Sequence, residues 1–379
     1  MEWQIPLSDV DFGPQEQEAV NHVLQSKWLT MGSVTQEFER AFATFVRARH
    51  AIAVTNATAG LHLACLAAGL GAGDEVILPS LTFVATANAV RYTGATPVFA
   101  DIAGDQDLTV SSHSIEGVLT ERTRAILVMH YGGYACDMPA ILNIARKHHL
   151  RVIEDAAHAI GSELDGRKLG TWGDIGCFSF FSNKNMTTGE GGMLVTDDDE
   201  RAERLRLLRS HGMTSLTWDR HKGHAWSYDV VDLGYNYRID EIRAALGLVQ
   251  LRKLPSNNER RRCLTQMYRD ALQELIPQMT LPFVDHAGVS AAHLMPVLLP
   301  AGADKSRFME NMKARGVQTS FHYPPIHTFT AYRGGQDGLS LPVTDAVAER
   351  EVTLPLYPTL RDEDVMTVVQ AAAAALNLL

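Results

Sequence analysis

Three stretches of the chain carry residue types that could do chemistry together, and the first is built around a single lysine. In "GCFSFFSNKNMTTGEGGMLVT" an apolar run ends in small polar residues at Lys184, and a glycine-containing turn follows. A lysine at the mouth of a parallel sheet can be partly desolvated, so that the pKa of its amine falls and the amine becomes a nucleophile. A solvated lysine on a loop is the plainer interpretation of this stretch taken alone.

The second stretch places an acid at the end of an apolar run. In "VIEDAAHAIG" the carboxylate of Asp155 is expected at the carboxyl end of a strand, where open α/β sheets place their ligands. A carboxylate there could keep a pyridine nitrogen protonated, and a protonated pyridine is the electron sink that pyridoxal-phosphate (PLP) chemistry needs. For a lone aspartate, N-capping of a following helix explains the same residue.

The third stretch, "AVTNATAGLHLA", turns from a strand directly into a helix of small and apolar residues. The free amides and the dipole at the start of such a helix form an anion site that suits a cofactor phosphate. An ordinary N-cap by Asn56 or Thr58 predicts the same letters.

The elements that must position these residues follow from the hydrophobic pattern. Between residues 50 and 200, short apolar runs alternate with helical patterns, as βαβ units do. Most of the runs are continuous, which is typical of strands buried on both faces. We therefore predict an α/β fold with a mainly parallel seven-stranded sheet flanked by helices. The strands are expected at residues 51–55, 75–79, 97–101, 125–130, 151–154, 176–181 and 193–196, and helices at residues 57–70, 82–93, 114–119, 138–149 and 200–209.

A smaller α/β domain is expected in the C-terminal third of the chain. Residues 240–254 form a helical pattern that Pro255 should end, and residues 258–275 form another. Further strands are expected at residues 293–299 and 317–321, with helices at residues 305–315 and 362–376. We place the large domain at residues 1–248 and the small one at residues 249–379, and the N-terminal segment could pack with the small domain.

Composition limits the partners. The formal net charge of −10 disfavours nucleic-acid and anionic-membrane binding, and no run of about 18 apolar residues suggests a membrane span. The N-terminus has no basic region followed by an apolar run, so no secretory signal is expected. The cysteines, Cys65, Cys136, Cys177 and Cys263, form no CxxC pair. We interpret them as buried free thiols in a reducing cytoplasm and expect no metal.

Taken together, these segments resemble the DegT/DnrJ/EryC1/StrS aminotransferases. Members of that family are PLP enzymes of the aspartate-aminotransferase fold (fold type I) that aminate keto-sugars on nucleotide carriers. The resemblance covers nearly the whole chain, and several motifs occur in the family's order. Besides the lysine stretch they are "GDEVILPSLTFVATANAV", "GATPVFADI", "VIEDAAHAIGS" and "LGYNYRIDEIRAALG".

The resemblance implies a role for each matching residue. Lys184 would carry the cofactor as a Schiff base and move the proton, and Asp155 would pair with the pyridinium nitrogen. The other implied cofactor contacts are His158 near the phenolic oxygen, Phe83 stacked on the ring, Ala57, Thr58 and Ser179 at the phosphate, and Asn236 reaching the phosphate from the neighbouring subunit. His322, Tyr323 and His327, in "FHYPPIH", fall where the family often contacts substrate. The family thus implies a homodimer with shared active sites.

The implied reaction is a two-stage amine transfer. L-Glutamate converts PLP to pyridoxamine 5'-phosphate, and a keto-sugar nucleotide then takes the amine. The segment "GEGGM" looks more like enzymes that aminate C4 than C3 of the sugar, which indicates a 4-keto-6-deoxy hexose. "FSFFSNK" is similar to "FSFFGNK"-type perosamine synthases, whose sugar carrier is GDP.

Three other functions remain open on the same fold. A PLP-dependent sugar 3-dehydratase would release water, but that branch of the family has histidine in place of the lysine, and this chain keeps Lys184. A 3-keto sugar aminotransferase would differ only in the carbon that receives the amine. A non-enzymatic protein could sense a nucleotide-sugar or the cofactor without turnover, although the positions that match the motifs look chemically intact.

Overall fold

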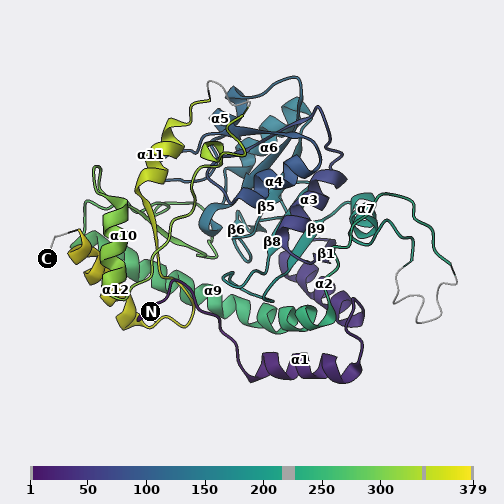
Figure 1. Ribbon diagram of the computed structural model, residues 1–379, viewed down its shortest axis with the longest axis horizontal. Helices are drawn as coiled ribbons and strands as arrows, with labels where there is room; N and C mark the ends of the chain where they lie inside the picture. Colours follow the sequence, from purple (N-terminus) through teal and green to yellow (C-terminus); the bar gives the residue numbers. More distant parts are fainter. Residues whose placement is uncertain (1–2, 216–226, 335–338, 377–379) are drawn as a thin grey trace.

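The computed structural model of the chain describes residues 3–215, 227–334 and 339–376. Within these ranges, a seven-stranded sheet in the order β1-β9-β8-β5-β4-β2-β3 forms the centre of the larger part of the molecule (Figure 1). Strand β9 runs antiparallel to both neighbours, and the other pairs are parallel. The strands are β1 (His50–Val54), β2 (Glu75–Pro79), β3 (Thr96–Ala100), β4 (Thr123–Met129), β5 (Arg151–Asp155), β8 (Ile175–Ser179) and β9 (Gly192–Thr196). The predicted mainly parallel sheet is confirmed.

Helices cover both faces of this sheet because its strands bury side chains on both sides. Every residue of β2, β8 and β9 is buried. Ile77 of β2 faces a core shared with α2, α5, α6 and α9, whereas its neighbours Val76 and Leu78 face a core shared with α3, α4 and α7. The bounds are α2 (Ser33–Val46), α3 (Ala57–Ala67), α4 (Val84–Tyr92), α5 (Ser112–Gly117), α6 (Met138–His148) and α7 (Asp199–Arg209). The helices between strands thus lie close to their predicted ranges.

The prediction that Pro255 ends a helix is wrong. Helix α9 runs without a break from Glu241 to Leu275 with Pro255 inside it (Figure 1). A proline cannot donate to the carbonyl four residues earlier, here that of Leu251, so the helix lacks one hydrogen bond at this point. Packing compensates, because α9 contacts α1 (Pro14–Ser26), α2 and α12 (Asp362–Ala375) along its length. The helix also passes through residue 248, and the division of the chain at that residue stays a prediction.

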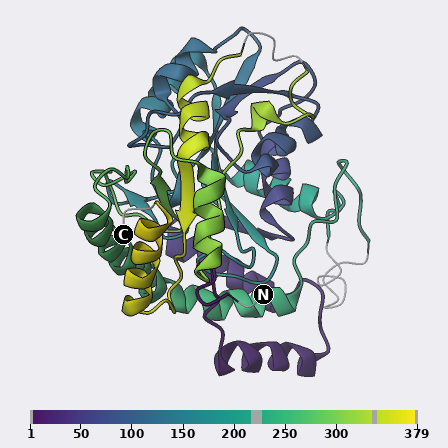
Figure 2. The ribbon, with the colours of Figure 1, turned by 60° about the vertical axis from the view of Figure 1, so that its left-hand side comes forward.

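A second core surrounds the latter half of α9. Helices α10 (Lys305–Ala314) and α12 pack next to each other there (Figure 2), beside an antiparallel pair formed by β10 (Met295–Leu298) and β11 (Glu351–Leu354). Ile5, near the N-terminus, belongs to the same core. Residues 317–321 are not the strand that was predicted: Val317 bridges to Ile5 and Ser320 bridges to Thr353, so the segment contacts two different partners instead of following one.

Several short elements had no sequence prediction. They are α11 (Pro342–Arg350), the 3₁₀ turns η1 (Tyr131–Gly133) and η2 (Ile326–Thr328), and a small hairpin of β6 (Glu163–Leu164) and β7 (Arg167–Lys168). The expectation of buried thiols holds for three cysteines and is wrong for Cys263, which is exposed on α9. Among the described residues, no helix combines the length and the apolar character needed to cross a membrane.

Glu241 ties the start of α9 to the start of α2. Its carboxylate accepts hydrogen bonds from the backbone N–H groups of Gly32, Val34 and Thr35, each at 2.8 Å, and from the Thr35 hydroxyl at 2.6 Å. The N-cap of α2 is Gly32, which has no side chain to satisfy the free amides of the first turn. A buried acid from another helix therefore takes the place of a cap.

We expect Glu241→Ala to destabilise the cofactor-free protein by about 3 kcal/mol, because several buried donors lose a charged acceptor. Glu241→Gln should cost about half as much, since its single amide oxygen can still accept. The measurement is urea denaturation followed by circular dichroism. Glu200→Ala, an exposed position on α7, is the control. A Glu241→Ala midpoint equal to that of the control would show that the carboxylate does not hold α2.

Candidate active site

A cavity of about 450 Å³ lies at the carboxyl ends of β5 and β8, next to the start of α3. Parallel strands bring their carboxyl ends to one edge, which is why residues distant in sequence meet there. The residues that line it and were predicted for the site are Ala57, Thr58, Phe83, Asp155, His158, Ser179, Lys184, His322 and Tyr323. The three stretches that each had a plainer explanation therefore converge on one cavity.

Lys184 follows β8 in a short turn, in which its own N–H donates to the carbonyl of Phe181 at 2.9 Å. Burial lowers the pKa of the Lys184 amine to about 8, and the negative charge of Asp155 opposes that shift. A lysine with such a pKa is partly neutral near physiological pH, and a neutral amine is the nucleophilic form. The amine is thus partly desolvated at the cavity rather than free on a solvated loop.

Asp155 is the last residue of β5, and its carboxylate is buried. One oxygen accepts from the Thr86 hydroxyl at 2.7 Å, and the other accepts from the N–H of Ala157 at 3.1 Å. Burial raises the pKa of Asp155, whereas the Thr86 hydrogen bond and, to a lesser extent, Lys184 lower it. The capping alternative is not realised as a helix cap, because turns rather than a helix follow Asp155.

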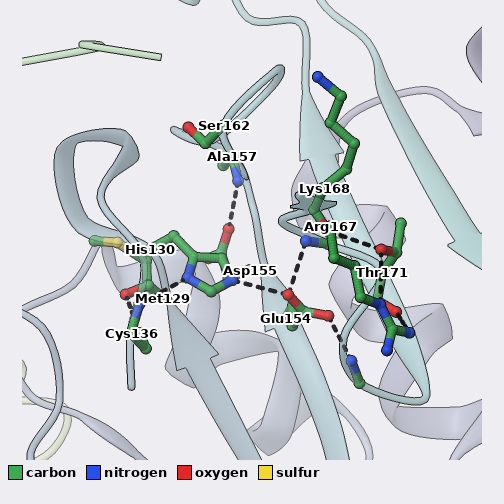
Figure 3. A network of polar contacts seen from close by, with 12 residues as sticks. Met129, His130, Cys136, Glu154, Asp155, Ala157, Ser162, Arg167, Lys168 and Thr171 are labelled. Atoms are coloured by element: carbon green, nitrogen blue, oxygen red, sulfur yellow. Dashed lines mark hydrogen bonds and ion pairs between the residues drawn. The ribbon is translucent and has the colours of Figure 1, made fainter. Parts of the chain in front are cut away.

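The neighbouring residue Glu154 points into a separate buried network (Figure 3). Its carboxylate accepts from the N–H groups of Gly170 at 2.7 Å and Gly173 at 2.6 Å, and it lies 2.9 Å from Nε2 of His130. Because the N–H of Cys136 donates to Nδ1 of His130, the proton of this imidazole lies on Nε2 and is donated to Glu154. These bonds join the ends of β4 and β5 to the loop before β8, and so fix the strand end that carries Asp155.

The start of α3 provides free amides at the cavity. Asn56 caps this helix, with its side-chain oxygen accepting from the N–H of Ala59 at 2.8 Å. The cap satisfies only one of the first-turn amides, and Ala57 and Thr58 at the first two helical positions line the cavity. The ordinary N-cap by Asn56 is therefore present and leaves other first-turn amides for an anion, while the anion site itself stays a prediction.

His158 and Tyr323 form a pair on one side of the cavity. The N–H of Gly132 donates to Nδ1 of His158 at 3.3 Å, so the imidazole proton lies on Nε2, which is 2.9 Å from the Tyr323 hydroxyl. Burial lowers the pKa of His158 well below its usual value, and the nearby Lys184 lowers it further. The ring centre of Phe83 lies 5.8 Å from that of Tyr323. With 54% of its surface exposed, Phe83 presents an aromatic ring to the cavity.

His322 is held from the C-terminal part of the chain. Its N–H donates to Glu351 at 2.7 Å, its Nδ1 lies 2.7 Å from the Thr353 hydroxyl, and its carbonyl accepts from the Tyr131 hydroxyl. Burial lowers the pKa of His322 to about 3 and raises that of Glu351 to about 7. Strand β11 therefore positions the "FHYPP" segment over the cavity.

Two predicted residues do not line this cavity. The ring nitrogens of His327 lie 2.8 Å from the Ser80 hydroxyl and 3.3 Å from the carboxylate of Asp345. Asn236 is exposed and pairs by a single bridge with Ser210, away from the cavity of its own chain. The proposed reach of Asn236 into a neighbouring subunit stays a prediction.

Sequence reasoning missed several residues of the site. Asn183 and Glu190 line the cavity on either side of the lysine turn, and their proximity to Lys184 in sequence was a usable signal. His293, whose Nε2 lies 3.4 Å from the Lys184 amine, gave no such signal because it lies far along the chain, just before β10. Thr86, whose hydroxyl donates to Asp155, also gave no signal in the sequence, because it lies in the first turn of a helix like many threonines without a role in a site.

The arrangement suits PLP in each part of that molecule. A desolvated amine can bond its aldehyde carbon, a buried carboxylate can pair with its ring nitrogen, and free helix amides can hold its phosphate. The aromatic face of Phe83 offers a stacking surface. The donor set therefore fits the cofactor.

Comparison with known proteins agrees with this chemistry. The model of the DegT/DnrJ/EryC1/StrS aminotransferase family matches residues 11–373. The spore coat polysaccharide biosynthesis protein SpsC of Bacillus subtilis is 41% identical over 374 residues, which cover 97% of this chain and 96% of that protein. Helicobacter pylori PseC, an aminotransferase involved in the biosynthesis of pseudoaminic acid, superposes with a TM-score of 0.92 at 30% identity over 100% of both chains. DesI, solved in the presence of its TDP-sugar product, superposes with a TM-score of 0.88 at 34% identity, over 99% of this chain and 93% of that one.

The pKa of Lys184 can be tested without cofactor or substrate. In the cofactor-free protein, acetylation of Lys184 should rise with pH around a midpoint near 8, followed by mass spectrometry with the exposed Lys27 as reference for the reagent. Asp155→Asn should move the midpoint to lower pH, because the carboxylate stabilises the charged ammonium and its loss favours the neutral amine. A higher midpoint in Asp155→Asn would contradict the coupling of the two groups.

Proposed function

Because the chain belongs to the DegT/DnrJ/EryC1/StrS aminotransferase family, we propose that it moves an amino group from L-glutamate to a keto-sugar nucleotide, at C4 of a 4-keto-6-deoxy hexose. The observation that carries this proposal is the desolvated amine of Lys184 beside Asp155, in a cavity that also receives the start of α3. The chain is a sugar aminotransferase, and the cofactor contacts, the donor and the sugar position are the proposed parts.

The similar proteins support a sugar nucleotide as substrate. PseC is an aminotransferase of pseudoaminic acid biosynthesis, and DesI was solved with a TDP-sugar product. SpsC is a polysaccharide biosynthesis protein. The choice of C4 rests on the "GEGGM" segment of this chain, and its Glu190 lines the cavity.

We assign the cofactor contacts residue by residue. Lys184 would bond the aldehyde carbon of PLP, and Asp155 would accept from the ring nitrogen. The amides of Ala57 and Thr58 and the hydroxyl of Ser179 would hold the phosphate, with His158 at the phenolic oxygen, Phe83 on the ring face, and His322 and Tyr323 toward the sugar. When bound, PLP supplies the carbon that exchanges amines and a conjugated ring that withdraws electrons from the reacting bond.

Lys184 is suited to hold and release a proton. A pKa of about 8 lets the amine exist in both forms near neutral pH, which is the condition for efficient general acid–base catalysis. Asp155 has two effects in the same site, because its charge raises the pKa of the lysine and its oxygens are oriented by Thr86 and Ala157. Neutral histidines around the amine add no competing positive charge.

A homodimer with shared active sites is part of the proposal. Asn236 is exposed and lies outside the cavity of its own chain, as a residue that serves a neighbouring subunit must. The cytoplasmic location expected from the cysteines also stays a prediction.

Lys184→Ala should abolish amine transfer, with a loss of roughly 10²- to 10⁴-fold or more, because both the covalent attachment and the proton carrier disappear. The purified wild-type protein should absorb visible light, and borohydride should fix the cofactor on the peptide that contains Lys184. Lys313→Ala, an exposed position on α10, is the matched control. Native-rate transfer by Lys184→Ala would refute the assignment.

A screen of 4-keto and 3-keto nucleotide-sugars on UDP, dTDP and GDP, read by mass, tests the substrate. We expect a 4-amino sugar that forms only with L-glutamate present. Loss of water without glutamate would indicate a dehydratase, and a 3-amino product would move the site to C3. Binding without any product would support the ligand-sensing alternative.

A further inference from the structure

We propose that His293 is a positioning residue for Lys184: its Nε2 accepts a hydrogen bond from the lysine amine and holds that amine at the cavity whenever it is not bonded to the cofactor. Nε2 of His293 lies 3.4 Å from Nζ of Lys184, and the side chain is buried. The inference rests on the proposed role of Lys184 and adds to it a partner outside every motif that the sequence pointed to.

The tautomer of His293 is fixed by Asn185, the residue after the lysine. Nδ2 of Asn185 donates to the carbonyl of Ala291 and to Oδ1 of Asn258, each at 2.7 Å. A carbonyl can only accept, so the amide orientation of Asn185 is determined and its oxygen faces Nδ1 of His293 at 2.8 Å. The imidazole proton must therefore lie on Nδ1, which leaves the lone pair of Nε2 pointing at Lys184.

The same network is anchored to rigid elements at its far end. Nδ2 of Asn258, on α9, donates to the carbonyl of Ile160 at 2.9 Å. Because a carbonyl can only accept, this contact fixes the amide orientation of Asn258 in the same way. The backbone N–H of His293 donates to the carbonyl of Gly132 at 2.9 Å, and its ring centre lies 4.4 Å from that of His158. These contacts leave the imidazole little freedom to turn, so the acceptor is present before the amine needs it.

An acceptor of this kind has two effects on a lysine amine. It takes one N–H, so the remaining hydrogens and the lone pair are directed away from His293 and toward the cavity. It also stabilises the ammonium form, because hydrogen bonds to charged groups are the stronger ones. Burial of the ring, and to a lesser extent the positive charges of Lys184 and Arg261, lower the pKa of His293 well below its usual value and keep the ring neutral. The ring can thus accept from the amine throughout the physiological pH range.

The test compares His293→Leu, which removes the acceptor, with His293→Gln, which retains an oxygen that can accept. In the cofactor-free full chain, His293→Leu should lower the midpoint of Lys184 acetylation by about one pH unit, because the ammonium loses its partner. His293→Gln should stay near the wild type. His286→Gln, on the segment that leads to His293, is the matched control and should leave the midpoint unchanged, since His286 contacts the carbonyl of Ala135 instead.

Steady-state kinetics of the holoenzyme provide a second measurement. For His293→Leu we expect kcat to fall by about ten- to a hundredfold with KM for the sugar unchanged, because His293 is not among the residues that line the cavity. His293→Gln should restore most of kcat. Equal losses in both variants, or a raised KM with unchanged kcat, would overturn the proposal and indicate a packing or binding role.

Asn185→Leu gives an independent variant in case His293→Leu does not fold. Leucine offers no oxygen to Nδ1 of His293, so the imidazole proton is no longer held on Nδ1 and can move to Nε2, and the acetylation midpoint of Lys184 should again fall. An unchanged midpoint would contradict the proposal. The acetylation measurements need neither cofactor nor substrate. A wild-type protein without the visible band would refute the proposed function and leave the hydrogen bond between His293 and Lys184 to be judged on the acetylation data alone.

Discussion

The desolvation of one amine beside one carboxylate is the interaction on which the rest of the structure depends. Burying a charged lysine costs free energy, and the negative charge of Asp155 reduces that cost for Lys184. The carboxylate offsets only part of the shift, so the pKa of the amine still falls to about 8. Asp155 is the last residue of β5, and Lys184 lies in the turn that follows the neighbouring strand β8, so the sheet and this turn together set their separation. The Glu154 network holds the end of β5 (Figure 3), and the contacts of Asn185 hold the turn that carries the lysine.

Much of this arrangement could be predicted from local patterns. Continuous apolar runs identified the strands of the central sheet, because strands buried on both faces leave no polar alternation. The polar residues at the ends of two of these runs, Asp155 and Lys184, and the strand-to-helix turn at Asn56 were sufficient to place one cavity, since parallel strands share an edge. The family resemblance added roles that these patterns alone left open, such as those of Phe83 and His158.

What could not be predicted depends on contacts between segments that are distant in the chain. Pro255 is a strong local signal for a helix end, yet packing of α9 against three other helices outweighs the hydrogen bond that it removes. Residues 317–321 look like a strand but contact Ile5 and Thr353 in turn. His293 and Glu351 act on the site only through tertiary contacts with Lys184 and His322, and nothing in their own neighbourhood marks them.

The unbroken path of α9 beneath both cores has a mechanical consequence. At Pro255 the helix lacks a backbone hydrogen bond, so this turn is held by one bond fewer than an ordinary turn of the helix. Asn258 lies within one turn of it and anchors the lysine network, while Arg261 donates to the carbonyls of His293 and Leu356. One helix of the C-terminal part thus supplies both the side chain that orients Asn185 and the side chain that contacts the backbone of His293, so the position of the imidazole beside the lysine amine depends on how α9 lies between the two cores.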